Sequence, residues 1–266
     1  FERWCDEEGL VPFPAEIETL CLFLEAQGSM VSPGTVRRRI YGIRKAHRLL
    51  DLPDPTRHEN VNLALRKARR MKPNRPKQAK GMTREYLERF LEVQPESPWG
   101  IRNRAMLSLG YDLLTRRSEL VALRAEDVSW RKDGTLRVLI RRSKSDQFGQ
   151  GRIAFTSRRS AQLLDEWLAF RGMHIAPLFC PIYQGKAINR NLTDMVLRRL
   201  IRDSAEKAGF DRSVVKQFSG HSMRVGAAQD LLSAGHDTAA IMRAGGWKSI
   251  DVLARYLEYA EFNVWA

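Results

Sequence analysis

Apolar side chains recur every three to four residues along most of the chain, which is the spacing of helices that bury one face. This spacing predicts a helix over residues 14–27, a second that begins with Ser32 and Pro33 and continues to about residue 50, and a third over residues 57–71. The side chains expected inside are Ile17, Leu20, Cys21 and Leu24 in the first helix, and Ile40, Ile43, Leu49 and Leu50 in the second. Residues 1–71 are therefore predicted to form a small all-helical domain.

Residues 72–82 interrupt the helical pattern. They begin with KPNRPKQAK, which has two prolines, four cations and no apolar side chain beyond Ala79. Such a composition is typical of an extended segment between domains. We therefore predict a basic interdomain linker whose cations follow a phosphate backbone, namely Lys72, Arg75, Lys77 and Lys80.

Residues 83–266 predict a larger second domain, mostly helical with a small β-sheet. Thr83 is placed to cap the first helix of this domain, and Val138 and Ile140 alternate with polar neighbours as in a strand. Further helices are predicted over residues 101–114, 118–123, 159–171 and 192–208, and two strands over residues 137–144 and 151–157. The predicted fold class is mainly α, with two helical domains joined by the linker.

The segment from residue 220 to residue 256 predicts three more short helices. They cover residues 221–234, residues 238–244 and residues 250 to about 259. Glycines follow the first two, and Ser249 is placed to cap the third.

The charge balance adds a partner to this picture. The 266 residues contain 45 Lys and Arg against 31 Asp and Glu, a net charge of +14. Residues 31–80 alone hold 15 cations against three acids, a net of +12. Such clustering favours a nucleic acid as partner over a merely solvated basic surface. The cations expected to contact DNA from the second helix are Arg37, Arg38, Arg39, Arg44 and Lys45.

The three cysteines, Cys5, Cys21 and Cys180, are odd in number and far apart, so they predict neither a disulfide framework nor a zinc site but a reducing, intracellular compartment. No His, Cys, Asp or Glu cluster has metal-ligand spacing, and no metal or cofactor is predicted. No apolar run is long enough for a membrane span and no signal peptide is visible. The chain begins with Phe1 in what resembles the end of a helix, so further residues are expected before it.

Candidate chemistry is concentrated near the end of the chain. His221 and Arg224 are three apart and share one face of a predicted helix, so their side chains are expected to project together from a packed scaffold. Trp247 lies in a turn, and Tyr256 follows nine residues later. Imidazole, guanidinium and indole groups offer N–H donors to a phosphate, and a phenol hydroxyl can attack phosphorus. The pattern predicts a phosphoryl-transfer site with a tyrosine nucleophile.

This order of residues resembles the active-site pattern of the tyrosine recombinases, the phage integrase family. The resemblance implies two further groups: an Arg-x-x-Glu pair formed by Arg116 and Glu119 in LLTRRSELVALRAEDV, and a general-acid lysine, Lys144, in RRSKSDQFGQGR. The alternatives to these residues are Arg117, Lys132 and, as the nucleophile, Tyr259.

The resemblance also implies an activity. Tyr256 would cleave DNA through a 3′-phosphotyrosyl linkage without metal, and four protomers would exchange strands between two duplex sites through a Holliday junction. The protein would act in the prokaryotic cytoplasm with the nucleoid, from a plasmid- or phage-borne gene. The alternatives are a type IB topoisomerase or telomere resolvase with the same site, or a non-catalytic DNA-binding protein. The residues expected to reach bases are Arg190, Asn191, Arg198, Arg199 and Arg202.

Overall fold

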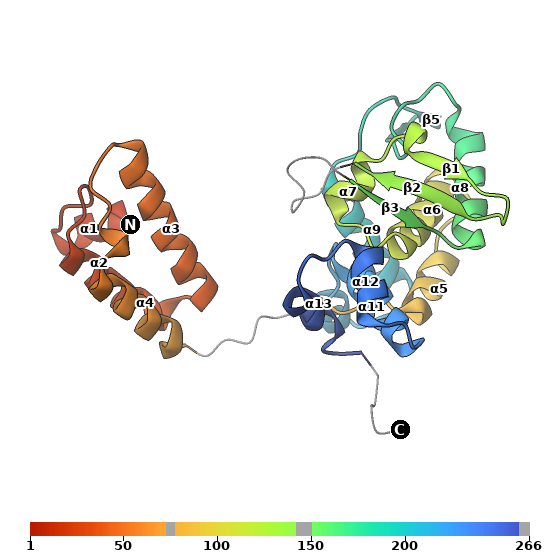
Figure 1. Ribbon diagram of the computed structural model, residues 1–266. Coiled ribbons are helices and arrows are strands. Elements are labelled where there is room, and N and C mark those ends of the chain that lie inside the picture. Colours follow the sequence, from red (N-terminus) through yellow and green to blue (C-terminus); the bar gives the residue numbers. More distant parts are fainter. Residues whose placement is uncertain (73–77, 142–150, 261–266) are drawn as a thin grey trace. The chain divides into compact units, whose positions relative to one another are not determined.

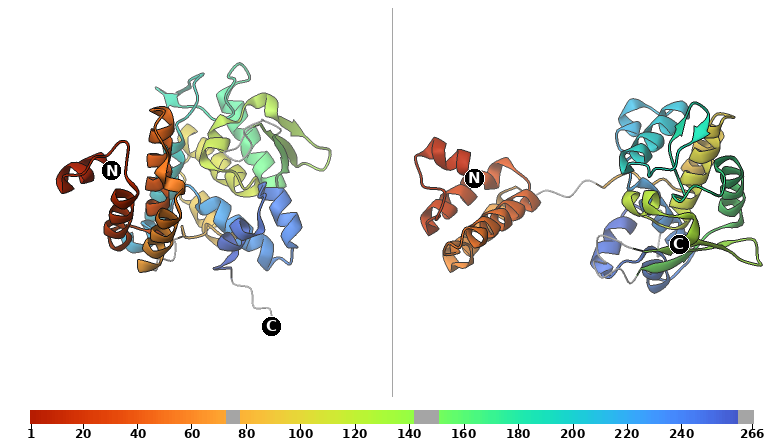
Figure 2. Two further views of the ribbon diagram at one scale, coloured as in Figure 1. Left: turned by 60° about the vertical axis from the view of Figure 1, so that its left-hand side comes forward. Right: turned by 90° about the horizontal axis from the view of Figure 1, so that it is seen from above.

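The computed structural model describes residues 1–72, 78–141 and 151–260. The chain divides into two compact units, Phe1–Lys77 and Gln78–Ala266, which are described separately below. The division falls within the residues predicted as the linker. Figures 1 and 2 show that the first unit is helical and that the second combines helices with a small sheet.

The first unit contains four α-helices and one 3-10 turn. They are α1 (Glu2–Glu8), α2 (Ile17–Met30), α3 (Pro33–Leu49), η1 (Pro55–Arg57) and α4 (Glu59–Met71). The Ser32 side chain accepts a hydrogen bond from the Thr35 N–H at 3.3 Å, so the predicted cap of α3 is present. Leu20, Phe23 and Leu24 of α2 are buried against Ile40 of α3 and Val61 of α4.

The end of α3 differs from its prediction. Leu49 and Leu50 are 75% and 56% exposed, so their expected place in the core was wrong. His47 is buried there instead, because it lies one turn after Ile43 on the inner face. Its ring is held on both sides, since Nδ1 donates to the Ile43 carbonyl at 2.9 Å and Nε2 accepts from the Ala15 N–H at 3.0 Å.

The second unit has a three-stranded antiparallel sheet in the order β1-β2-β3, together with a two-stranded hairpin of β4 and β5. Val138 at the centre of β2 pairs with Val128 and with Ala154, and its side chain is buried. The strands are β1 (Val128–Trp130), β2 (Leu136–Ile140), β3 (Arg152–Phe155), β4 (Ile182–Tyr183) and β5 (Lys186–Ala187). Only β2 and β3 were predicted.

Helices before and after this sheet in the sequence build most of the core. Those before it are α5 (Arg84–Glu92), α6 (Pro98–Asp112) and α7 (Arg117–Ala122), with the 3-10 turn η2 (Ala125–Asp127). Those after it are α8 (Arg158–Arg171), α9 (Asp194–Lys207), α10 (Arg212–Val215), α11 (Ser222–Ser233), α12 (Thr238–Gly245) and α13 (Ile250–Leu257). A mainly α fold with a small sheet is thus confirmed.

Helices α6 and α11 cross closely in the centre of the second unit. A Cβ added at Gly110 of α6 would lie 2.6 Å from the terminal methyl of Met223 of α11, so glycine permits the approach. The three predicted C-terminal helices, α11 to α13, form one end of this unit, drawn in blue in Figure 1. They enclose a smaller apolar cluster around Ile241, Trp247 and Leu253.

Candidate active site

The turn between α6 and α7 is the point on which the candidate site is built. Leu114 has a φ of 47°, in the left-handed region that a leucine rarely adopts. Its carbonyl accepts from the Arg224 guanidinium and, at 3.4 Å, from Nη2 of Arg152, which also donates to the Leu113 carbonyl at 2.7 Å. Such a backbone conformation persists only when its surroundings impose it, and here two buried cations do so.

Arg116 leads directly out of this turn and is fixed by Glu119. The Glu119 side chain is 1% exposed, and it accepts from the Arg116 backbone N–H at 3.0 Å and from Nη1 of Arg116 at 2.5 Å. A carboxylate in these two contacts orients the guanidinium and offsets its charge. Arg117 lies elsewhere: it packs over Gly220 and is 3.6 Å from the carboxylate of Asp194. Of the two arginines, Arg116 is the one held by Glu119.

Arg224 lies at the centre of the site and is fully buried. Its guanidinium carbon lies 3.9 Å from the ring centre of Trp247 and 5.9 Å from that of Tyr256. Burial, and then the charge of Arg116, lowers the pKa of Arg224 to about 10, so the group stays charged at neutral pH. Within the described residues its Nε and Nη2 have no hydrogen-bond partner.

Trp247 and Tyr256 meet edge to face, with ring centres 5.2 Å apart at an angle of 68°. Trp247 is 6% exposed, and its indole lies directly over Gly245, where any Cβ would overlap the ring. Gly246 has a φ of 65° and turns the chain into this position. Tyr256 is half-buried in the last turn of α13, whereas Tyr259 is 55% exposed beyond the helix.

His221 precedes the first turn of α11 and is exposed, in contrast to the buried Arg224. His221 is the N-cap of α11 rather than a residue within it, so this helix begins one residue later than predicted. The imidazole is still within electrostatic reach of the site. Partial burial and the charges of Arg117, Arg224 and Arg116 lower the pKa of His221 below its usual 6.5, which keeps it neutral at pH 7.

The sequence did not single out Arg152, which joins three parts of the site from β3. Its Nη1 donates to the Ala244 carbonyl at 2.5 Å, its Nη2 donates to Leu113, and Nη2 lies 3.9 Å from the Glu119 carboxylate. Burial lowers the pKa of Arg152 to about 10. A strand-end arginine next to a glycine carries no distinctive sequence signal, so only the packing identifies it.

Some predicted site residues lie outside the described part of the chain, namely Lys144 in the site and Arg75 and Lys77 in the linker. Lys132 is exposed in the turn between β1 and β2. Lys72 donates to the Met30 carbonyl at 3.2 Å, and the Lys80 ammonium lies 5.1 Å from the ring centre of Tyr86.

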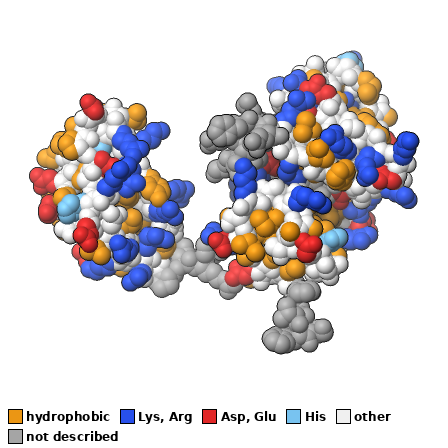
Figure 3. All heavy atoms as spheres, in the orientation of Figure 1, with side chains coloured by type: hydrophobic (Ala, Val, Ile, Leu, Met, Phe, Trp, Pro, Cys, Tyr) orange, Lys and Arg blue, Asp and Glu red, His pale blue; other side chains and the backbone are white. Residues whose placement is uncertain are grey.

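The DNA-contact candidates fall into two groups. Figure 3 shows many Lys and Arg side chains on the drawn face of the first unit. Those of α3 that are exposed are Arg37, Arg38, Arg39 and Lys45. Arg44 is instead half-buried, with Nε donating to Thr56 Oγ1 at 2.8 Å.

In the second unit the exposed candidates are Arg190, Asn191 and Arg199, while Arg198 and Arg202 are half-buried. Arg202 donates to the carbonyls of Phe218 at 3.0 Å and Lys216 at 3.3 Å. Arg44 and Arg202 thus already contribute to packing, and the exposed residues are the stronger candidates for DNA contact.

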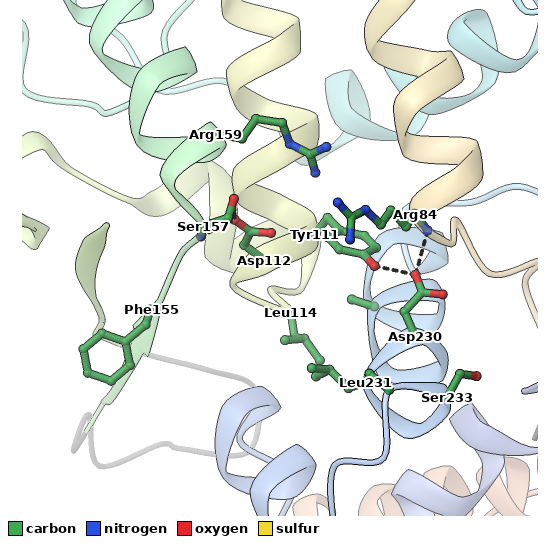
Figure 4. Close-up of a pocket in the computed structure, with 12 residues that line it drawn as sticks. Arg84, Tyr111, Asp112, Leu114, Phe155, Ser157, Arg159, Asp230, Leu231 and Ser233 are labelled. Atoms are coloured by element: carbon green, nitrogen blue, oxygen red, sulfur yellow. Dashed lines mark hydrogen bonds between the residues drawn. The ribbon is translucent and has the colours of Figure 1, made fainter. Parts of the chain in front are cut away.

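A separate pocket of roughly 700 Å³ lies between α6, α11 and the start of α8 (Figure 4). On one side, the Asp230 carboxylate accepts hydrogen bonds from the Tyr111 hydroxyl and, at 2.6 Å, from the Arg84 N–H. The second of these bonds caps the start of α5, where the Thr83 side chain makes no capping bond. Burial and the Asp230 carboxylate raise the pKa of Tyr111, so this phenol stays protonated. The pocket is not lined by Arg116, Arg224 or Tyr256.

Among the residues that the structure describes, no group of three or more His, Cys, Asp or Glu could hold a metal ion. None of the helices within these ranges combines the length and apolar character needed to cross a membrane.

The chain is similar to known proteins over nearly its whole length. Residues 80–261 match the family model of the phage integrase family. The chain is 28% identical to the recombinase Cre of Escherichia phage P1, over 96% of this chain and 79% of Cre. It is also 28% identical to an integrase/recombinase XerD homologue of Selenomonas ruminantium, over 97% of this chain and 78% of that protein.

Solved structures share the fold. The XerH site-specific recombinase, crystallised with a palindromic difH substrate after cleavage, superposes with a TM-score of 0.64 at 20% identity, over 93% of this chain and 70% of XerH. A λ integrase dimer bound to a COC′ core site gives 0.63 at 14% identity, over 95% and 84% of the two chains. The fold, the clustered arginines with Trp247 and Tyr256, and the family match agree. The chain belongs to the phage integrase family and is a tyrosine site-specific recombinase.

Proposed function

We propose that this recombinase cleaves and rejoins duplex DNA through a 3′-phosphotyrosyl intermediate formed by Tyr256. The observation that carries the proposal is the buried Arg224, two of whose donors are unpaired within the described residues. The aromatic rings of Trp247 and Tyr256 lie beside its guanidinium. Buried donors are rarely left unpaired in proteins, and a nonbridging phosphate oxygen would satisfy both. The phenol would then lie next to the phosphorus it attacks.

In the proposed step the Tyr256 oxygen forms a bond to phosphorus while the bond to the 5′ oxygen breaks. Negative charge grows on the two nonbridging oxygens, and fixed donors lower the energy of that state. Arg116 and Arg224 are assigned to these oxygens, with His221 and the indole N–H of Trp247 as further donors. Lys144, outside the described residues, is assigned to protonate the leaving 5′ oxygen.

The phenol must also lose a proton, since the ordinary pKa of tyrosine is near 10. Glu119 is already engaged with Arg116, as described above. The neutral imidazole of His221 is therefore the better candidate for the acceptor, because its lowered pKa leaves a free lone pair at pH 7.

Rejoining follows from the same chemistry. The phosphotyrosyl bond keeps the energy of the broken phosphodiester, so a 5′ hydroxyl from a second duplex can displace Tyr256 without ATP. We propose that four protomers on two DNA sites carry out this exchange through a Holliday junction. The XerH and λ integrase structures are complexes with a difH substrate and a COC′ core site, which supports duplex DNA as the partner. The proposed setting is a prokaryotic cytoplasm, at the nucleoid, with a plasmid- or phage-borne gene.

The test is a nicked duplex that traps the covalent intermediate, made from a site selected out of random DNA. Wild-type protein in EDTA should give a protein–DNA band on a denaturing gel, and Tyr256→Phe should give none. Tyr259→Phe is the matched control and should keep the band. A band that survives in Tyr256→Phe but is lost in Tyr259→Phe would contradict the assignment of the nucleophile. Tight binding with no band in the wild type would favour a non-catalytic DNA-binding protein.

Strand exchange needs its own measurement. Two differently labelled duplexes that carry the selected site should yield joined products of mixed label. Covalent cleavage with relaxation of supercoils, but without mixed products, would favour a topoisomerase.

A further inference from the structure

Two glutamines hold the backbone of Tyr256. The last carbonyls of a helix have no partner within the helix, and Tyr256 lies in the last turn of α13. Its carbonyl accepts from Nε2 of Gln78 at 3.3 Å and from Nε2 of Gln229 at 3.2 Å. The residue that carries the candidate nucleophile is therefore fixed from outside its own helix.

The two donors come from different places along the chain. Gln229 is 6% exposed and belongs to α11, the helix that also contains Arg224. Gln78 is the first residue of the second unit and lies within residues 72–82, the predicted linker. The position of Tyr256 thus depends on the helix of Arg224 and on the segment that enters the unit.

That entering segment, residues 78–84, is itself hydrogen-bonded to α11 and to the residues just before it. The Lys80 N–H donates to the Gln217 carbonyl at 3.1 Å, and the Met82 N–H donates to the Ser222 carbonyl at 2.7 Å. At its far end the Arg84 N–H is held by Asp230, and Gly226 leaves room for the Met82 backbone because any Cβ there would overlap it. Gln78 is thus presented by a segment that is fixed along the length of α11.

Helix α13 depends on such external contacts because its own anchors are few. All eight residues of this helix are described by the structure. Its N-cap Ser249 makes no side-chain capping bond, and Leu253 is its one buried residue. Short helices are marginal without tertiary contacts. Two hydrogen bonds to the Tyr256 carbonyl therefore add to the ring contact with Trp247 in positioning the phenol.

We propose that Gln78 and Gln229 are positioning residues that set the attack geometry of Tyr256 through its backbone carbonyl. This inference rests on the proposed role of Tyr256 as the nucleophile. It assigns to Gln78, at the end of the linker that enters the second unit, and to Gln229 of α11 a positioning role that involves contact with neither the phosphate nor the phenol. A displacement of the linker would therefore change the position of Tyr256 through the hydrogen bond from Gln78.

The test compares Gln78→Met, Gln229→Met and the double variant with wild type on the nicked substrate at saturating DNA. Methionine keeps the length of the side chain and its neutral charge but cannot donate. We expect the rate of covalent adduct formation to fall about tenfold in each single variant, and further in the double variant, since small displacements of a nucleophile are costly. DNA affinity should stay within about twofold of wild type, whereas a slower rate caused by weaker DNA binding would be accompanied by a larger loss of affinity. Gln162→Met, on the exposed side of α8, is the matched control and should keep the wild-type rate.

A second substrate separates an effect on the nucleophile from an effect on the leaving group. With sulfur in place of the 5′ oxygen, the leaving thiolate needs no proton, so faults in proton donation should disappear. The loss in Gln78→Met should remain with this substrate. Its disappearance, or wild-type rates in both single variants and the double variant, would overturn the inference. An adduct that persists in Tyr256→Phe would instead overturn the proposed function, so the two failures are distinguishable.

Discussion

Two groups of arginines in the second unit each contain a fully buried guanidinium but are differently surrounded. Arg224, with Arg152, lies around the Leu114 turn, whereas Arg102 and Arg171 lie around residues 177–180. Arg102 donates to the Cys180 carbonyl at 3.3 Å, and Arg171 donates to the Pro177 carbonyl. In both groups, as far as the structure describes them, guanidinium nitrogens remain without a partner.

The difference lies in the chemistry next to each group. Arg224 faces Trp247 and Tyr256, a phenol that can attack, while the group around residues 177–180 holds Cys180, whose fully buried thiol has its pKa raised by desolvation. Unpaired buried donors therefore do not by themselves identify a reaction site. They do so where a nucleophile lies beside them.

The largest effect is expected for Arg224→Lys. Lysine keeps the charge but loses the planar fork and the stacking on Trp247, so cleavage of the nicked substrate should fall by about 10²- to 10³-fold. DNA affinity should change little. Arg243→Lys, on the exposed part of α12, is the matched control and should cleave at the wild-type rate. A loss of less than about tenfold in Arg224→Lys would remove Arg224 from the centre of the site.

Arg152→Met should lower both stability and rate. It removes donors from the Leu113 and Ala244 carbonyls, at a cost of about 1–3 kcal/mol in the free energy of unfolding. Cleavage should fall about tenfold, because Glu119 and the Leu114 turn lose a neighbour that fixes them. Urea unfolding and the adduct rate measure the two effects, with the exposed Arg137→Met as control. Full activity in Arg152→Met would show that β3 does not organise the site.

A smaller effect, on the pH dependence of stability, is expected for His221. Because its folded pKa lies below 6.5, the unfolded chain takes up a proton at this residue first as the pH falls. The unfolded state then binds more protons, so the free energy of unfolding decreases below pH 6.5. His221→Gln should lose less stability than wild type between about pH 7.5 and about pH 5.5, by under about 1 kcal/mol since the side chain is exposed.

Urea unfolding at the two pH values measures this difference, with the exposed His174→Gln as control. An equal loss in His221→Gln and wild type would mean that the arginines nearby do not act on this imidazole.

The smallest effect on cleavage is expected for Arg171→Met, at the second group of arginines. The rate per folded molecule should stay within about twofold of wild type, because no reacting group lies there. Stability should fall by about 1–3 kcal/mol, since the buried Pro177 carbonyl loses its donor. A loss of cleavage as large as that expected for Arg224→Lys would erase the contrast between the two groups.

The sequence predicted what local rules determine. Helical spacing located α3, α6, α9 and α11, and the Ser32 cap is present as expected. The family pattern selected Arg116, Glu119, Arg224, Trp247 and Tyr256, which the structure brings together.

Features that depend on tertiary contacts could not be predicted. Burial of His47 in place of Leu49 requires the Ala15 N–H, which comes from another segment 32 residues away. The cap of α5 comes from Asp230 rather than from Thr83, and the contact of Gln78 with Tyr256 spans 178 residues. Such partners are far apart in sequence, and single side chains carry no sign of them.

The Gly245 position beneath Trp247 has a practical consequence for engineering. The target site of a recombinase can be altered by screening libraries of randomised residues. In a library that varies residues 245–247, most members would carry a side chain at position 245 that overlaps the position of the Trp247 indole. The exposed residues Arg190, Asn191 and Arg199 carry no such restriction and are the better places to vary. Holding Gly245 constant confines the search to sequences in which Trp247 and Tyr256 can still meet.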